Sequence, residues 1–470
     1  MRISGWLVCL GMALQTSCSS SNNSGAGGAG MGTGGTSPGT GGTSVGTGGS
    51  SPGTGGAPAG TGGASAGTGG TSAGSGGAAG GGGLPYTMLP EIPGPIDDTV
   101  ITTPANGLRL SSSTNARFAV GPDGSVVVLD ARNLIKYDPT ITTPIWTTPF
   151  PPLNAGVGRI DPLDIAIDSQ GNTYVTGSET VSTAPFTLNP DLTKYSPAGV
   201  LVWDEVLPAA NVSFNNIMVT SNDQIVVTGS GAGQLPNQPA AARGGGFVVR
   251  YDVAGNLLSS FQSTAAPYNR GARMFGLGNG PNNEAIINFA EILGLVDTAG
   301  ALIWASTTVI DLDMTSSPDG SIIASTTPYL SMNARTFVRF SPITGAVTTA
   351  QTLGKRTVVL NAAEGSMWQG NFYSPSRMVA TRDAVYMSGI YMNTYINGSN
   401  PKPNNTVTYL VKIDAATGNQ VWAHLYGAPS TNTYIQTPFI ELGLGVSGQL
   451  IANVDGRLLL RLSTVDGSFL

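Results

Sequence analysis

The most regular feature of the chain is a recurring order of apolar and polar positions, best developed between residues 165 and 207. Short runs rich in β-branched and aromatic residues lie at 165–167, 173–177, 192–195 and 200–203. Turn-forming Asp, Gly, Asn or Pro residues separate most of these runs. Runs of this length and composition, bounded by turn residues, predict β-strands. The segment therefore predicts one four-stranded antiparallel sheet.

The same order recurs along the rest of the chain. Its copies lie at residues 118–146, 165–207, 217–261, 274–304, 312–349, 378–422 and 442–470. Strand-rich copies at a spacing of roughly 35–65 residues are typical of β-propeller blades, and the strand-like runs exclude helical solenoids. We therefore expect an all-β fold, a seven-bladed β-propeller of four-stranded antiparallel blades, with eight blades as the alternative count.

The last copy ends at Leu470, where its fourth strand should begin. A ring that closes must take this strand from elsewhere in the chain. The stretch 96–103 precedes the first copy and has the composition of a strand at 99–102. We expect it to complete the final blade, because this pairing would remove an open sheet edge.

The repeats are preceded by a segment with no pattern of buried positions. Residues 24–83 are almost purely Gly, Ala, Ser, Thr and Pro, with a seven-residue period. Such a sequence cannot offset the entropy of ordering, so we expect a disordered tether over 18–84. About 60 flexible residues give a root-mean-square reach on the order of 40 Å. We expect it to act as a spacer.

The N-terminus has the layout of an export signal. Arg2 precedes a short apolar stretch, and Leu14-Gln15-Thr16-Ser17-Cys18 follows. This resembles the bacterial lipobox, although Gln15 stands where leucine is usual. The resemblance implies a signal peptide over 1–17, acylation of Cys18 including palmitate, and an outer-membrane lipoprotein at the cell surface or on the periplasmic side. An ordinary secretory signal is the alternative. The propeller domain then spans 85–470.

Two motifs carry a resemblance to known propellers. The order Asp-x-x-Gly-Asn-x-Tyr-Val-Thr-Gly at 168–177 is similar to bacterial repeats of the SBBP type. The stretch 413–422, which ends in Val421-Trp422, is similar to the repeat of pyrroloquinoline-quinone enzymes and their non-enzymatic relatives. The tether resembles linkers of myxobacterial surface lipoproteins. These resemblances imply the fold, with Asp and Gly in turns and Trp packed between blades.

Composition narrows the chemistry. Only 10% of residues are charged, the formal net charge is −6, and no cluster of basic residues occurs, which disfavours nucleic acid as a partner. Cys9 and Cys18 are the two cysteines, so the propeller has no thiol, disulfide or Cys-bound metal. His424 is the single histidine, and we interpret it as structural. We expect no cofactor, no metal and no catalytic residues.

Paired carboxylates could support hydrolysis, and the chain offers two pairs. These are Asp161 with Asp164, and Asp311 with Asp313. We interpret them as turn-capping or solvated residues. A cluster of buried carboxylates near the propeller axis would instead favour a hydrolase or lyase.

The insertions at 178–190, 230–246 and 390–408, and the connections 263–273 and 351–377, are expected as loops on one face of the disc. Tyr391, Asn393, Tyr395 and Asn397 form the most conspicuous group there, and aromatic rings with amides suit a glycan or a protein surface. The sequence thus predicts a non-catalytic binding or scaffold module for a protein or polysaccharide. The alternatives are a lipoprotein similar to outer-membrane assembly factors, a propeller hydrolase or lyase, and surface loops without function.

Overall fold

A computed structural model gives the architecture of the chain. It describes residues 86–92, 100–102, 107–110, 116–130, 133–150, 159–183, 186–207, 212–231, 233–235, 238, 245–263, 274–289, 292–309, 314–326, 335–353, 355–361, 366–397, 400–427, 439–454 and 458–470. The tether, the signal segment and Cys18 lie outside these residues. In the described part no helix is long and apolar enough to cross a bilayer.

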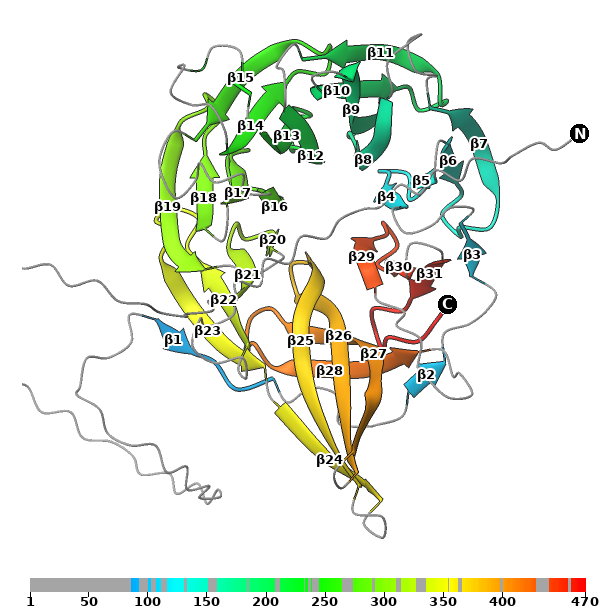
Figure 1. The fold of residues 1–470 in the computed structure, drawn as a ribbon, viewed down its shortest axis with the longest axis vertical. Helices are drawn as coiled ribbons and strands as arrows, with labels where there is room; N and C mark the ends of the chain where they lie inside the picture. The colour runs from blue at the N-terminus through cyan, green and yellow to red at the C-terminus, as the bar shows by residue number, and fades with distance from the viewer. Residues whose placement is uncertain are drawn as a thin grey trace, which may run out of the picture. The chain divides into compact units, whose positions relative to one another are not determined.

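Seven antiparallel sheets stand around a common axis as the blades of a β-propeller, which confirms the seven-blade prediction over the eight-blade one (Figure 1). In each blade the first strand lies nearest the axis and the outer strand forms the rim. Blades 1 and 2 comprise β4 (Arg117–Val120), β5 (Val126–Asp130), β6 (Asn133–Tyr137), β7 (Pro144–Pro149), and β8 (Arg159–Ile167), β9 (Thr173–Thr183), β10 (Phe186–Tyr195), β11 (Leu201–Val206). Blades 3 and 4 comprise β12 (Val212–Val219), β13 (Ile225–Gly231), β14 (Gly245–Tyr251), β15 (Leu257–Gln262), and β16 (Met274–Asn279), β17 (Ala285–Phe289), β18 (Ile292–Val296), β19 (Leu302–Val309).

The remaining blades follow the same order. Blade 5 comprises β20 (Met314–Ser316), β21 (Ile322–Thr326), β22 (Arg335–Phe340) and β23 (Val347–Leu353). Blade 6 comprises β25 (Ser366–Ala380), β26 (Ala384–Asn397), β27 (Asn400–Asp414) and β28 (Gln420–Gly427), with β24 (Lys355–Asn361) added beside β25. Blade 7 comprises β29 (Phe439–Leu444), β30 (Leu450–Val454) and β31 (Leu458–Leu462).

Three short N-terminal strands, which we call the strap, line the rim of blades 5 to 7. β1 (Thr87–Met88) pairs in parallel with β23, and β2 (Val100–Thr102) pairs in parallel with β28. β3 (Leu108–Arg109) pairs antiparallel with β31 and supplies an outer strand to blade 7. The prediction that residues 99–102 complete the final blade is therefore wrong. The N-terminal region does close the ring, but through residues 108–109, because the earlier strand already pairs with blade 6.

Two of the expected loops are strands. β9 and β10 continue as a hairpin through most of 178–190, and β26 and β27 continue through most of 390–408. The connection 351–377 likewise holds β24 and most of β25. The prediction of irregular loops at these places is wrong, because alternating polar and apolar residues can extend a ladder that is already paired. Figure 1 shows the resulting hairpin of β25, β26 and β27 reaching outward from the ring.

The tight turns between first and second strands explain the Asp-x-x-Gly-Asn-x-Tyr motif. The Asp168 carboxylate accepts hydrogen bonds from the backbone N–H groups of Gln170 and Asn172, at 3.0 and 2.8 Å. The Tyr174 hydroxyl donates to the same carboxylate at 2.9 Å. Gly171 takes the left-handed conformation, with φ of 83°, which a side chain would strain. The motif is therefore structural, as the sequence indicated.

Outer-strand tryptophans join some of the blades to the next one. The indole N–H of Trp146 donates to the Pro197 carbonyl in the turn of blade 2, at 2.9 Å, and Trp304 donates to Pro342 in blade 5, at 3.0 Å. Two lysines opposite other outer-strand tryptophans make a similar contact. Lys194, opposite Trp203, donates to the Val253 carbonyl of blade 3 at 2.7 Å, and Lys412, opposite Trp422, donates to the Thr464 carbonyl of blade 7 at 2.8 Å. The expected packing of Trp between blades is confirmed, and the lysine contribution was not foreseen.

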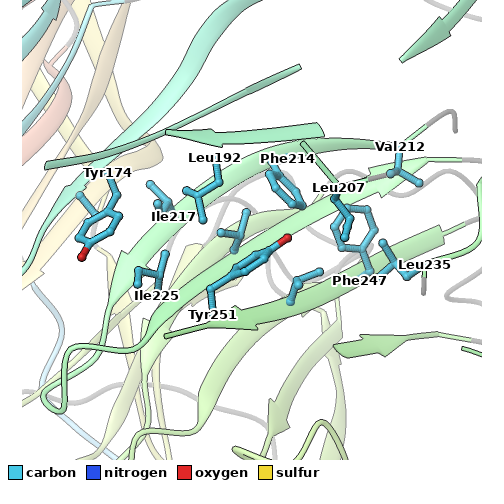
Figure 2. Packing of buried hydrophobic residues seen from close by; sticks show 13 residues of the cluster. Tyr174, Leu192, Leu207, Val212, Phe214, Ile217, Ile225, Leu235, Phe247 and Tyr251 are labelled. Carbon is cyan, nitrogen blue, oxygen red and sulfur yellow. The ribbon is translucent and has the colours of Figure 1, made fainter. Parts of the chain in front are cut away.

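Blade packing supplies the core of the protein. The largest cluster of buried residues lies between blades 2 and 3, where Tyr174 and Leu192 meet Phe214, Phe247 and neighbours (Figure 2). The rings of Phe214 and Phe247 cross edge to face, with centroids 6.0 Å apart. Burial of aromatic and branched side chains of this size stabilises by about 1.5–3 kcal/mol each. Without disulfides, such interfaces hold the ring together.

Candidate functional site

The innermost strands carry one equivalent position each, four residues before the tight turn. In the order of the blades it is occupied by Arg117, Asp164, Asn216, Gly276, Asp313, Arg377 and Glu441. Asp313 lies outside the described residues. The four charged members that the structure describes, Arg377, Glu441, Arg117 and Asp164, follow one another around blades 6, 7, 1 and 2. We call these four residues the axial ring; basic and acidic side chains alternate in it.

An irregularity in the first strand precedes most of these positions. The register with the second strand shifts between Phe214 and Asn216, between Pro375 and Arg377, and between Phe439 and Glu441. A shift of this kind is a β-bulge, which bends the strand and redirects the following side chain. Bulges at equivalent places in several blades indicate that the orientation of the ring position is a constructed feature of the fold.

The two acidic members of the axial ring link neighbouring blades. The Glu441 carboxylate accepts a hydrogen bond from the backbone N–H of Phe118 at 3.1 Å, and the Asp164 carboxylate accepts one from Ile217 at 2.9 Å. In both cases the donor lies in the next blade, one residue after its own ring position. The interpretation of Asp164 as a turn-capping residue is therefore wrong. Asp161 lies within β8, and Asp311 and Asp313 lie outside the described residues.

The environment of the axial ring changes the acidity of both carboxyl groups. Burial raises the pKa of Glu441 to about 7; Arg117 and Arg377 lower it and the nearby Asp164 raises it further. Burial likewise raises the pKa of Asp164, against the opposing effect of Arg117 and the hydrogen bond from Ile217. All four residues keep part of their surface accessible. Glu441 can therefore exchange a proton near neutral pH.

A second set of polar side chains lies opposite the ring positions on the second strands. Register pairs Asp164 with Thr176, Asn216 with Thr228, Arg377 with Ser388 and Glu441 with Asn453. These four second-strand residues are fully buried. Asn453 donates to the Ala116 carbonyl of blade 1 at 2.6 Å. We call these four second-strand residues the belt. Burying polar groups between apolar strands costs free energy, so the belt is a specific feature of the fold.

The sequence-predicted group lies on one strand. Tyr391, Asn393, Tyr395 and Asn397 occupy alternate positions of β26. Register places Phe372 opposite Tyr391, and Trp368 opposite Tyr395, on the neighbouring β25. The structure thus places the four residues on one strand, and its register places two further aromatic residues, which the sequence analysis did not single out, beside Tyr391 and Tyr395. The signal was available, because Trp368 and Phe372 also stand an even number of residues apart.

A pocket of about 430 Å³ lies between the tight turns that join the first and second strands of blades 3, 4 and 5. Its lining includes Ser221, Asn279, Asn283 and Asp319. The Ser221 hydroxyl is hydrogen-bonded to the Asn283 amide oxygen at 2.6 Å, and Asp319 accepts from the Ser321 backbone at 2.9 Å. These polar groups are engaged in joining turns, so the pocket has the character of a gap between turns.

The remaining candidates take structural places. His424 stacks on Trp422, with ring centroids 5.3 Å apart, and contacts the Asp466 carbonyl at 2.8 Å through Nε2. This agrees with its structural interpretation. Among the described residues no three His, Cys, Asp or Glu side chains come together as metal ligands.

No protein-family model matches the chain, and no curated protein matches it. Among solved structures, a Bacteroides caccae protein described as being of unknown function is similar at 12% identity and a TM-score of 0.36, covering 67% of this chain and 94% of its own. A chain of a mitotic checkpoint complex is similar at 8% identity and a TM-score of 0.43, covering 77% of this chain and 96% of its own.

Proposed function

We propose that the chain is a lipid-anchored protein of the outer membrane whose propeller binds a protein or polysaccharide without catalysing a reaction. A β-propeller is in general a rigid scaffold for binding. The observation that carries the proposal is the row of Tyr391, Asn393 and Tyr395 on β26, in register with Trp368 and Phe372. The row stands on a hairpin that projects from the ring (Figure 1).

Aromatic and amide side chains in alternation suit polar organic surfaces. An aromatic ring offers an apolar face for the C–H groups of a sugar or for a peptide, and amides supply hydrogen bonds in both directions. A strand fixes the spacing of such groups better than a loop does. The mild negative charge of the chain argues against anionic polymers as ligands.

Binding is tested with the full chain on a glycan array and in pull-down experiments with envelope extracts. Tyr391→Ala and Tyr395→Ala should each weaken binding about 10-fold or more, because removal of a stacking ring costs about 1–3 kcal/mol. Met392→Ala and Ile396→Ala, at the alternating positions of the same strand, are the matched controls and should leave affinity unchanged. Equal loss in both sets would contradict a role for this face.

The anchor and its location have separate tests. Metabolic labelling with palmitate should mark the wild-type chain and not Cys18→Ser, which should appear in the soluble fraction. Protease added to whole cells should digest the propeller if it faces outward. Protection in whole cells, with digestion after lysis, would favour the alternative of a periplasmic assembly factor.

A second candidate function is a propeller hydrolase or lyase, favoured by Asp164 and Glu441. Two carboxyl groups close enough to interact, one with a pKa near 7, can serve as an acid and base pair. Incubation with a panel of polysaccharides and detection of new reducing ends tests this. Cleavage that Glu441→Gln abolishes would establish it, and absence of cleavage by the wild-type chain would leave the binding proposal standing.

A further inference from the structure

The outer strand of each blade has an edge that faces away from the ring, and most of these edges are occupied or blocked. Register aligns them. In blades 1, 2, 3, 5 and 6 a third-strand lysine or arginine lies opposite one outer-strand residue, and the residue after that one is Thr147, Asp204, Ser260, Ala350 or Ala423. In blade 4 Leu295 takes the place of the cation, and the equivalent outer-strand residue is Ala305. At Ala350 this residue points its carbonyl outward, since it accepts the Leu89 N–H of the strap at 2.8 Å. We call these the edge positions.

Blades 5 and 6 have the edges of their outer strands covered by added strands. β1 lies on β23, where Ile92 N–H also donates to the Thr352 carbonyl at 2.9 Å. β2 lies on β28, whereas β3 pairs with β31 and is itself the outer strand of blade 7. The edge of a blade in this molecule is therefore a surface that accepts a short extended segment.

Blade 3 is capped by a side chain that imitates a strand. The amide nitrogen of Gln238 donates to the Ser260 carbonyl at 2.8 Å, and its amide oxygen accepts from the Gln262 N–H at 3.3 Å. A carbonyl and an N–H two residues apart are the groups that a parallel strand would use. One side-chain amide thus takes the place of a backbone peptide group.

Blades 1 and 2 carry residues that prevent strand addition. β7 begins and ends with Pro144 and Pro149, and proline lacks the N–H that an added strand needs. β11 carries Asp204 at the edge position and Glu205 beside it. Charged residues on an edge are a common protection against pairing with another chain.

Blade 4 has none of these devices within the residues that the structure describes. β19 reads Leu-Ile-Trp-Ala-Ser-Thr-Thr-Val, with no proline and no charge. Leu302 and Ile303 are 37% and 49% exposed. The Trp304 side chain is held toward blade 5, by its bond to Pro342, so it does not cover the edge. An uncharged edge rich in β-branched residues, on which no added strand lies among the described residues, is a template for pairing.

We propose that the outer edge of β19, around Ile303 and Ala305, binds an extended segment of another protein as an added parallel strand. β1 and β2 supply the model for the occupant: both are parallel, uncharged and followed by proline within a few residues. The tether of this chain does not fit, because its Gly, Ala, Ser, Thr and Pro residues favour no strand. A second copy does not fit either, since two-fold pairing of β19 with itself would be antiparallel.

Photo-crosslinking of the full chain in its native cells tests this inference, which does not depend on β26. A p-benzoylphenylalanine residue replaces Ile303, and in the matched control it replaces Ile145, which is 56% exposed on β7. A second probe at Ala305 reports whether the added strand runs parallel or antiparallel to β19. We expect adducts from β19 with one other protein, within an uncharged extended segment, and the Ala305 probe should attach about two residues later than the Ile303 probe.

Charge on the edge distinguishes strand addition from nonspecific capture. Ala305→Asp copies Asp204 of blade 2 and should reduce the Ile303 adduct at least 10-fold, while Thr147→Asp on β7 should leave it unchanged. Thermal melting confirms that both variants are folded. Adducts between isotopically distinct copies of this chain, adduct yields no higher than at Ile145, or a yield unaffected by Ala305→Asp would each overturn the proposal.

Discussion

The interface between blades 2 and 3 and the seam between blades 7 and 1 use the same hydrogen bond in different circumstances. In both, a ring carboxylate accepts the N–H that follows the ring position of the next blade. Blades 2 and 3 are also continuous in sequence and share the largest buried cluster. The seam joins residues more than 300 positions apart, with a contact separation of 323 for Glu441 and Phe118. Ring closure is therefore the entropically costly step.

Additional contacts compensate at the seam. β3 pairs with β31, Asn453 donates to Ala116, and Leu110 packs with Phe118 and Leu459. The C-terminal Leu470 N–H donates to the Arg461 carbonyl at 3.0 Å on the same strand. Where consecutive blades are continuous in sequence, the hydrogen bond to the axial-ring carboxylate and the apolar packing are sufficient. Closure of the ring additionally needs strands from the N-terminal and C-terminal parts of the chain.

The largest expected effect comes from removing the strap. Deletion of residues 1–110 takes away β1 to β3 together with the buried Ile92 and Leu110, and should lower the free energy of unfolding by about 5 kcal/mol or more. Deletion of residues 1–85 is the control and should leave it unchanged. Denaturant unfolding measures both, and similar midpoints would contradict a strap that closes the ring.

The second largest effect is expected from removing a buried phenylalanine side chain at each of the two interfaces. Phe214→Ala and Phe118→Ala should each cost about 3–5 kcal/mol, because both side chains are buried in blade interfaces. The two variants should differ in hydrogen exchange. Only Phe118→Ala should accelerate exchange at Leu108 and Arg109. Acceleration there by Phe214→Ala would show that the seam is not a separate unit.

The belt residues allow a finer comparison. Asn453→Leu removes the hydrogen bond to Ala116 across the seam and should cost about 1–3 kcal/mol. Thr228→Val in blade 3 removes a buried hydroxyl that has no hydrogen-bond partner among the described residues, and should be neutral or stabilising. Chemical denaturation of both variants measures the difference, and equal losses would contradict a special role for the seam.

The smallest effect is the pH dependence of the seam. Because the pKa of Glu441 is raised to about 7 in the folded chain, its contribution to stability is complete below the unfolded value near 4.5 and is lost as pH rises through 7. The free energy of unfolding should therefore fall between pH 5 and pH 8, and Glu441→Gln should make this fall smaller by about 1–2 kcal/mol. Unfolding curves at both pH values measure it; an unchanged decline would contradict this assignment.

The repeated segments show how far local sequence information reaches. Residues 165–207 predicted all four strands of blade 2, because alternation and turn residues act within a few positions. The long hairpin of blade 6 escaped prediction, since Tyr391, Asn393 and Tyr395 form a strand only beside β25 and β27. The axial ring escaped for a similar reason. Arg117, Asp164, Arg377 and Glu441 come together only after the blades have closed around the axis.

The sequence by itself determined the class of fold, the number of blades, the structure of the turns and the packing role of tryptophan, because each depends on neighbouring residues and recurs in several copies. Tertiary structure alone decided which segment closes the ring, which carboxylates gather at the axis and which outer strands pair with β1 and β2. These features depend on residues far apart in the chain, and the free energy of such contacts is expressed only when the complete ring excludes water and fixes the register of distant strands.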